Sequence, residues 1–301
     1  LVVLVTLNKE KYVYIITGGK VLLCILADTF LVSTLPFSAN LGVNGIGVSN
    51  IIVNVLLLGV TIAILYKEGI KVFAKEKFEF AWMREFVKIG GISGLESFIR
   101  NLAYMLMVVR MVNVVNEQGT YWVANNFIWG WLLLPVTQLA ELIKRDVAAD
   151  KKAIEEKTLG YFFITFVICA FWCVSIPIWK PFMTNVLQYS DVDKLFSLVL
   201  ILLGFYVLYA FQNVFDATFY GLGKTHYMAF ESIVTNAIYY VGAFILYLTG
   251  VWVPTLTGIA LLFGIGMAFD SVVSFGAYWF LLKKNGWNLL RISSEVNGVE
   301  Q

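Results

Sequence analysis

The chain has 301 residues, of which 59% are apolar and only 14% are charged, and 22 basic against 20 acidic residues give a net charge of +2. Soluble domains are about 45–50% apolar and about 25% charged, so this composition excludes a soluble globular enzyme and a disordered chain. It also excludes a nucleic-acid-binding protein, which needs a basic face. The class that remains is an all-α integral membrane protein.

Eight stretches of the chain are apolar enough, and long enough at about 20 residues, to cross a bilayer as helices. In chain order the predicted transmembrane helices are residues 13–37, 46–66, 86–112, 121–142, 159–181, 195–220, 227–249 and 256–282. Residues 1–7 are also mostly apolar and do not begin with Met. We therefore expect them to be the end of an earlier membrane helix, in a chain that lacks the N-terminal helices of its parent.

Basic residues predict how these spans are oriented. Seventeen of the 22 Lys and Arg residues lie in connections on one side of the predicted spans, and only Lys180 and Lys194 lie on the other. Cytoplasmic loops carry the excess of Lys and Arg, so both ends of the chain are expected in the cytoplasm. The charged and aromatic segment 67–85 is predicted to be an amphipathic linker on the membrane surface. It separates residues 1–66 from the six spans of residues 86–284, and residues 285–301 form a cytoplasmic tail.

Cysteine and histidine limit the chemistry that the chain can perform. It has three cysteines, Cys24, Cys169 and Cys173, and one histidine, His226, from which we cannot assemble the four ligands of a zinc site. We expect no metal, no cofactor and no enzymatic activity. An intramembrane prenyltransferase, the enzyme alternative, would need paired Asp-rich motifs, and no two carboxylates inside the spans have that spacing.

Four segments carry a resemblance to a known family. They are LGVNGIGVSNIIVN at the second span, KIGGISGLESF at the third, FYGLGKTHYMAFESIVTN between the sixth and seventh, and PTLTGIALLFG at the eighth. At these residues the chain resembles the multidrug and toxic compound extrusion (MATE) family of cation-coupled exporters, whose twelve helices form two six-helix lobes. The resemblance implies that the eight spans are helices five to twelve. The segment VTQLAELIKRD after Pro135 departs from the family, which usually has small residues and glycine there.

Asp216 is the first candidate for a binding residue. Gln212 and Asn213 precede it by four and three residues, so the three side chains can share one helix face. An ionisable group inside a span is costly and indicates function by default. Neighbouring aromatic residues such as Tyr209 are typical of a cavity for amphiphilic cations. The resemblance implies a functional Asp in this helix, about one to two turns farther from its cytoplasmic end.

A second group of candidates comprises Glu96, Arg100 and Asn101 in the third span. Glu96 and Arg100 are spaced to pair on one helix, either as a fixed ion pair or as partners that exchange between states. The resemblance implies a Glu near Asn101, and it does not include Arg100. Asp28 is the candidate in the first bundle, although interhelical hydrogen bonding is an equal interpretation for Asp28 and for Asp270. Glu231 is a further single carboxylate.

The resemblance implies a secondary active transporter of the plasma membrane. By alternating access between two lobes, a monomer would export small organic solutes, cationic or amphiphilic, in exchange for protons or sodium. We expect the lipid bilayer and these solutes as partners, and no nucleic acid. A lipid-linked saccharide flippase of the same broad superfamily stays open, because Arg100 and Arg110 could line its cavity.

Overall fold

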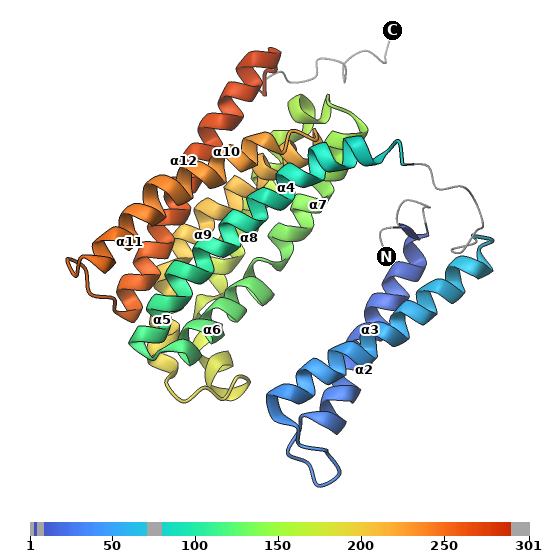
Figure 1. The fold of residues 1–301 in the computed structure, drawn as a ribbon, viewed down its shortest axis with the longest axis vertical. Helices are drawn as coiled ribbons and strands as arrows, with labels where there is room; N and C mark the ends of the chain where they lie inside the picture. The colour runs from blue at the N-terminus through green and yellow to red at the C-terminus, as the bar shows by residue number, and fades with distance from the viewer. Residues whose placement is uncertain (1–2, 5–8, 71–79, 290–301) are drawn as a thin grey trace. The chain divides into compact units, whose positions relative to one another are not determined.

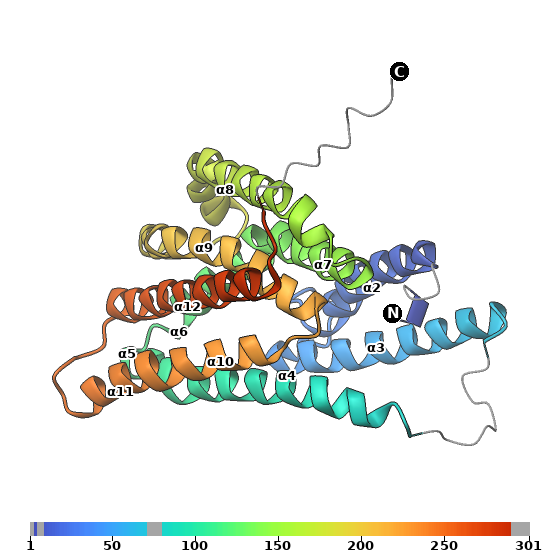
Figure 2. The ribbon, with the colours of Figure 1, turned by 90° about the horizontal axis from the view of Figure 1, so that it is seen from above.

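The computed structural model describes residues 3–4, 9–70 and 80–289 (Figures 1 and 2), and within them it has eleven labelled α-helices, three π-helical segments and no strand. The chain divides into two compact units, residues 1–79 and 80–301. The middle of the linker predicted at 67–85 lies outside the described residues, as do most of the helix end predicted at 1–7 and most of the tail predicted at 285–301.

The first unit is a pair of helices, α2 (Glu10–Leu31) and α3 (Gly42–Lys67), which pack against each other. Their close approach depends on Gly45, where an added Cβ would lie 2.8 Å from the carbonyl oxygen of Leu31. A side chain at this position would therefore force the two backbones apart.

The second unit is a larger bundle. Its elements are α4 (Met83–Ala103), η1 (Tyr104–Val109), α5 (Arg110–Val115), α6 (Gln118–Phe127), η2 (Ile128–Leu132), α7 (Leu134–Ala149), α8 (Ala153–Asn185), α9 (Val192–Gly221), α10 (His226–Val234), η3 (Thr235–Tyr240), α11 (Val241–Leu248) and α12 (Leu256–Asn285). Helix α9 packs against α7, α8 and α12, and α4 packs against α10. Both views show α9 and α12 side by side (Figures 1 and 2).

Seven helices among the described residues are long and apolar enough to cross a membrane, and an eighth span is possible if one bent pair counts as a single span. The chain is therefore an all-α, multi-pass membrane protein. The bent pair comprises Gln118–Leu132 and Leu134–Ala149, which meet at 50°, where the sequence predicts one span over 121–142. Pro135, at the start of α7, explains the bend, because it lacks an N–H group and its ring crowds the carbonyl of the preceding turn.

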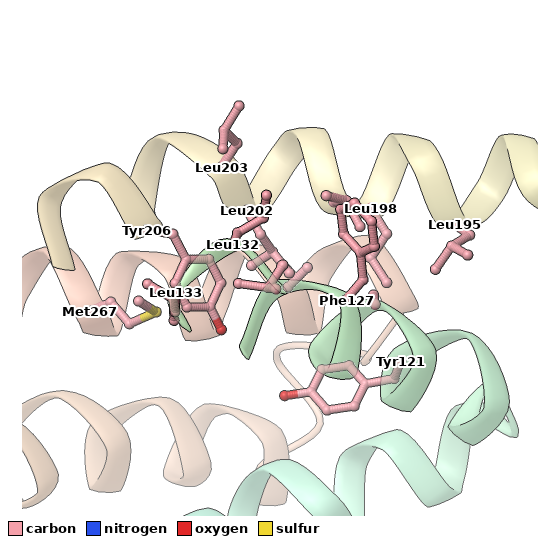
Figure 3. Close-up of a cluster of buried hydrophobic side chains, with 14 of the residues drawn as sticks. Tyr121, Phe127, Leu132, Leu133, Leu195, Leu198, Leu202, Leu203, Tyr206 and Met267 are labelled. Atoms are coloured by element: carbon pink, nitrogen blue, oxygen red, sulfur yellow. The ribbon is translucent and has the colours of Figure 1, made fainter. Parts of the chain in front are cut away.

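The core of the second unit lies along one face of α9. Leu195, Leu198, Leu202 and Tyr206 recur at helical spacing and are each at most 4% exposed, which is the pattern of a helix face that meets a core. Figure 3 shows these side chains with Phe127 of α6 in the same buried cluster. This packing fixes α9 as the central element of the bundle.

An ion pair links two elements at one end of this bundle. The Lys194 ammonium donates a hydrogen bond to Glu117 Oε1 at 2.8 Å, and the Thr120 hydroxyl donates to Glu117 Oε2 at 3.0 Å. These bonds favour the ionised carboxylate, and they hold the pKa of Glu117 below its usual range. The pair connects the start of α6 to the start of α9.

Candidate binding cavity

A cavity of about 450 Å³ lies inside the second unit. Side chains from α4, α6, α9, α10, α12 and all three π-helical segments line it. Its volume is within the range of pockets that hold small molecules, about 300–1,000 Å³. The lining combines charged residues with aromatic rings.

Four carboxylates line this cavity, each from a different helix: Glu96 of α4, Asp216 of α9, Glu231 of α10 and Asp270 of α12. Arg100 of α4 is the single basic residue among the described residues of the lining. Because buried carboxylates need compensation by opposite charge or hydrogen bonds, the lining has capacity for a further positive charge.

Gln212 bridges two of these carboxylates. Its amide nitrogen donates a hydrogen bond to Asp270 Oδ2 at 2.7 Å and a longer one to Asp216 Oδ2 at 3.4 Å. The Gln212 carbonyl oxygen in turn accepts a hydrogen bond from the Ser271 hydroxyl at 2.8 Å. Gln212 is only 2% exposed, so α9 and α12 are joined by a buried polar network.

Two hydroxyl groups donate further hydrogen bonds to the bridged carboxylates. Ser274 donates to Asp216 Oδ1 at 2.9 Å, and Thr235 donates to Asp270 Oδ1 at 2.6 Å. Each of the two aspartates therefore accepts two hydrogen bonds. The donors to these two carboxyl groups come from three elements, α9, α12 and η3.

Glu96 and Arg100 form the predicted pair within α4. Arg100 Nη1 lies 3.2 Å from Glu96 Oε1, and the Ser97 hydroxyl donates to Glu96 Oε2 at 3.2 Å. The Glu96 side chain is buried at 3% exposure, whereas Arg100 is 59% exposed. Arg100 therefore neutralises Glu96 and leaves the other three carboxylates without a paired cation among the described residues.

Aromatic rings form the remaining wall of the cavity: Tyr104, Trp122, Trp129, Tyr209, Tyr240 and Phe263. The Trp129 indole is fixed by a hydrogen bond of 3.0 Å to the Tyr206 hydroxyl, and its ring centroid lies 5.5 Å from that of Tyr209. Aromatic faces attract cations and pack against apolar groups.

All three π-helical segments contribute to the lining, through Tyr104, Trp129 and Tyr240 among others. A local cause is present at two of them. Asn101 and Asn236 each donate a side-chain hydrogen bond of 2.7 Å to the carbonyl four residues earlier, next to η1 and within η3. Such bonds compete with the helix ladder for that carbonyl, and π-helical turns are frequent at functional sites.

Six of the eight residues predicted as a binding site line this one cavity: Asp216, Gln212, Glu96, Arg100, Asn101 and Tyr209. The structure places the other two elsewhere. Asn213 donates to the Tyr209 carbonyl at 3.2 Å and does not line the cavity. Asp28 belongs to the first unit, where it accepts a hydrogen bond of 2.5 Å from Ser49 across α2 and α3.

Glu231 and Asp270 are the two carboxylates of the lining that the sequence did not assign to the site. Each was recognisable as a carboxylate within a span, but neither has a second acidic residue within eight positions.

The described residues hold no group of three or more His, Cys, Asp or Glu side chains suited to a metal ion. Comparisons of the chain with protein-family models, with curated proteins and with solved structures found no match.

Proposed function

We propose that this membrane protein is a secondary active transporter, which binds an organic cation in the cavity of its second unit and exports it in exchange for an inward-moving cation. One observation carries the proposal: the same cavity combines four carboxylates, one arginine and six aromatic rings.

The charge of the lining supports a positively charged solute. With Glu96 paired to Arg100, the carboxyl groups of Asp216, Glu231 and Asp270 remain to face the solute. Two opposite unit charges about 4 Å apart attract by about 4 kcal/mol at the dielectric typical of partly buried sites. Each cation–π contact adds about 0.5–2 kcal/mol. An amphiphilic cation can use both kinds of contact.

The same charge balance argues against the flippase alternative. A lipid-linked saccharide has an anionic pyrophosphate, which needs several basic residues around it. Arg100 is half-exposed in the lining, but Arg110 is absent from it and four carboxylates surround the space. We therefore include in the transporter proposal a twelve-helix, two-lobe architecture, a location in the plasma membrane and, from the distribution of Lys and Arg, cytoplasmic ends of the chain.

Binding of a permanent organic cation tests this function directly. The full chain in lipid nanodiscs should bind tetraphenylphosphonium, and Asp216→Asn should weaken that binding by at least about tenfold, the equivalent of about 1.4 kcal/mol. Asp193→Asn is the matched control, because Asp193 is 82% exposed at the start of α9 and outside the cavity. Equal affinities for the wild type and Asp216→Asn would refute the proposal. Displacement of the probe by a polyprenyl pyrophosphate would favour the flippase instead.

Transport itself needs a second assay. Proteoliposomes that contain the full chain should move the probe cation against its gradient when a proton or sodium gradient is imposed. Asp216→Asn should lose this movement, and Asp193→Asn should retain it. The absence of coupled movement by a wild-type chain that binds the probe would limit the function to binding.

A further inference from the structure

Glu231 is a deeply buried acidic residue of the cavity, and one of its two carboxyl oxygens has no hydrogen-bond partner among the described residues. The residue is 3% exposed, and the oxygen in question is Oε1. The Glu231 carboxyl also hydrogen-bonds with the Asp216 carboxyl and with the Ser274 hydroxyl. Two carboxyl groups can form such a bond only if one of them holds a proton.

The surrounding donors determine which carboxyl group holds that proton. The Gln212 amide donates its N–H groups to Asp216 and Asp270. The single hydroxyl proton of Ser274 is donated to Asp216, and that of Thr235 is donated to Asp270. Both aspartates thus receive two donated hydrogen bonds, whereas Glu231 Oε1 receives none among the described residues. A protonated Glu231 is itself a donor, so it hydrogen-bonds Asp216, and its neutral carboxyl leaves Oε1 unpartnered at a lower cost than an ionised one would.

The charged and titratable groups that face Glu231 from neighbouring elements agree with this placement. They are Glu96 and Arg100 of α4, Asp216 of α9, Asp270 of α12 and Tyr240 of η3. Arg100 is paired with Glu96, so an ionised Glu231 would lie beside two further acidic side chains with no paired cation among the described residues. Like charges at such a buried site disfavour ionisation, unless a cation enters.

We propose that Glu231 carries the proton that this site exchanges for its cargo. The inference rests on the proposed function only in that the cavity takes a cation. When the cavity holds no cation, the Glu231 O–H is donated to Asp216. When a monovalent organic cation enters beside Asp216 and Asp270, the O–H bond of Glu231 breaks and the proton leaves through the cavity to water. One positive charge enters as another leaves, so the total charge of the site is unchanged.

Proton exchange at Glu231 makes a simple demand on the site and has a direct consequence for the pH dependence of binding. A shared proton needs only the carboxyl pair that is present. Exchange of one proton makes the affinity for the cargo cation fall as the pH falls.

The protonated carboxyl can be detected without any cargo. Infrared difference spectra of the full chain in nanodiscs should contain a protonated-carboxyl C=O band that shifts in heavy water and is lost in Glu231→Gln. The matched control is Glu141→Gln, since Glu141 is 66% exposed on α7 and outside the cavity. A band that persists unchanged in Glu231→Gln would overturn the assignment to Glu231.

The exchange is then measured on the same samples with tetraphenylphosphonium, a cation that carries no proton, and a pH-indicator dye. The wild type and Glu141→Gln should release one proton for each probe ion bound, with an affinity that changes about tenfold per pH unit. Glu231→Gln should bind the probe without release and without this pH dependence, and Glu231→Asp should restore both. Proton release by Glu231→Gln would overturn the proposal. A wild type that shows the infrared band but does not bind the probe would overturn the proposed function, and the exchange with it.

Discussion

Replacement of Gln212 by Leu tests the bridge between the two aspartates. Leucine has a similar volume but no donor, so Asp270 Oδ2 loses a bond of 2.7 Å and Asp216 Oδ2 loses one of 3.4 Å. A hydrogen bond to a charged group contributes about 1.5–3 kcal/mol, and the longer bond contributes roughly 0.5 kcal/mol at its poorer distance. Ser271 loses nothing, because its hydroxyl also reaches the Met267 carbonyl at 2.8 Å. The expected loss of unfolding free energy is therefore about 2–3.5 kcal/mol.

Unfolding by sodium dodecyl sulfate, followed through tryptophan fluorescence, measures this loss for the full chain in mixed micelles. Gln138→Leu is the matched control, because Gln138 is exposed on α7 and surface substitutions usually change stability by less than about 0.5 kcal/mol. If Gln212→Leu unfolds at the same detergent fraction as Gln138→Leu, the two carboxylates do not depend on the amide. The polar network deduced from the distances would then be wrong.

Three further variants test the aromatic wall, the helix packing and the ion pair outside the cavity. Trp129→Ala removes a ring of the cavity wall, and it should weaken tetraphenylphosphonium binding by about 5–30-fold, as expected for about 1–2 kcal/mol of cation–π attraction, in the nanodisc binding assay. Gly264→Ala places a methyl group against the Phe205 ring, and it should destabilise the chain by about 1–3 kcal/mol through overpacking in the detergent-unfolding assay. Gly276→Ala, where the added methyl group meets open space, should leave stability unchanged or raise it. Glu117 has a pKa below its ordinary value of 4.5 because of its hydrogen bonds to a lysine and a threonine. The ionised Glu117 therefore contributes its full stabilisation at a pH above 4.5. This contribution is lost as the pH falls through the folded-state pKa of Glu117. Glu117→Gln should remove this acid-dependent part of an unfolding curve measured against pH.

The helical spans could be predicted because their signal is local. A run of apolar residues long enough to cross the bilayer is recognisable without any knowledge of its neighbours, and seven described helices meet that criterion. The bend between η2 and α7 was less predictable, although Pro135 was visible. Proline in a membrane helix can produce a kink, a break or only a local adjustment, depending on which neighbouring groups satisfy the backbone. Here Trp172 donates to the Leu132 carbonyl at 3.1 Å, a contact forty residues apart in sequence.

The candidate site was predictable only where its members lie on one helix. Gln212 and Asp216 are four residues apart, and they line the same cavity as the helical spacing predicts. The pairing of Glu96 with Arg100 is of the same kind. Glu231 lies fifteen residues beyond Asp216 and on another helix, so only the packing of α10 against α9 and α12 brings it into the cavity.

Polar residues at matching helical spacing on α9 and α12 are the sequence signal that would have extended the predicted binding site from one helix to a second. Asp270, Ser271 and Ser274 recur at helical spacing on the otherwise apolar α12, and a polar stripe inside a membrane needs partners on whichever helix packs against it. The partners are Gln212 and Asp216 of α9, at 2.7–2.9 Å for the three shortest bonds. Asn213 has no such counterpart on α12, and its side chain donates instead to a carbonyl of its own helix. The rule that each polar group in a span requires a partner therefore separates the residues that join two helices from a neighbour that satisfies itself locally. In this chain it selects α12 as the helix opposite Asp216 without reference to any carboxylate spacing.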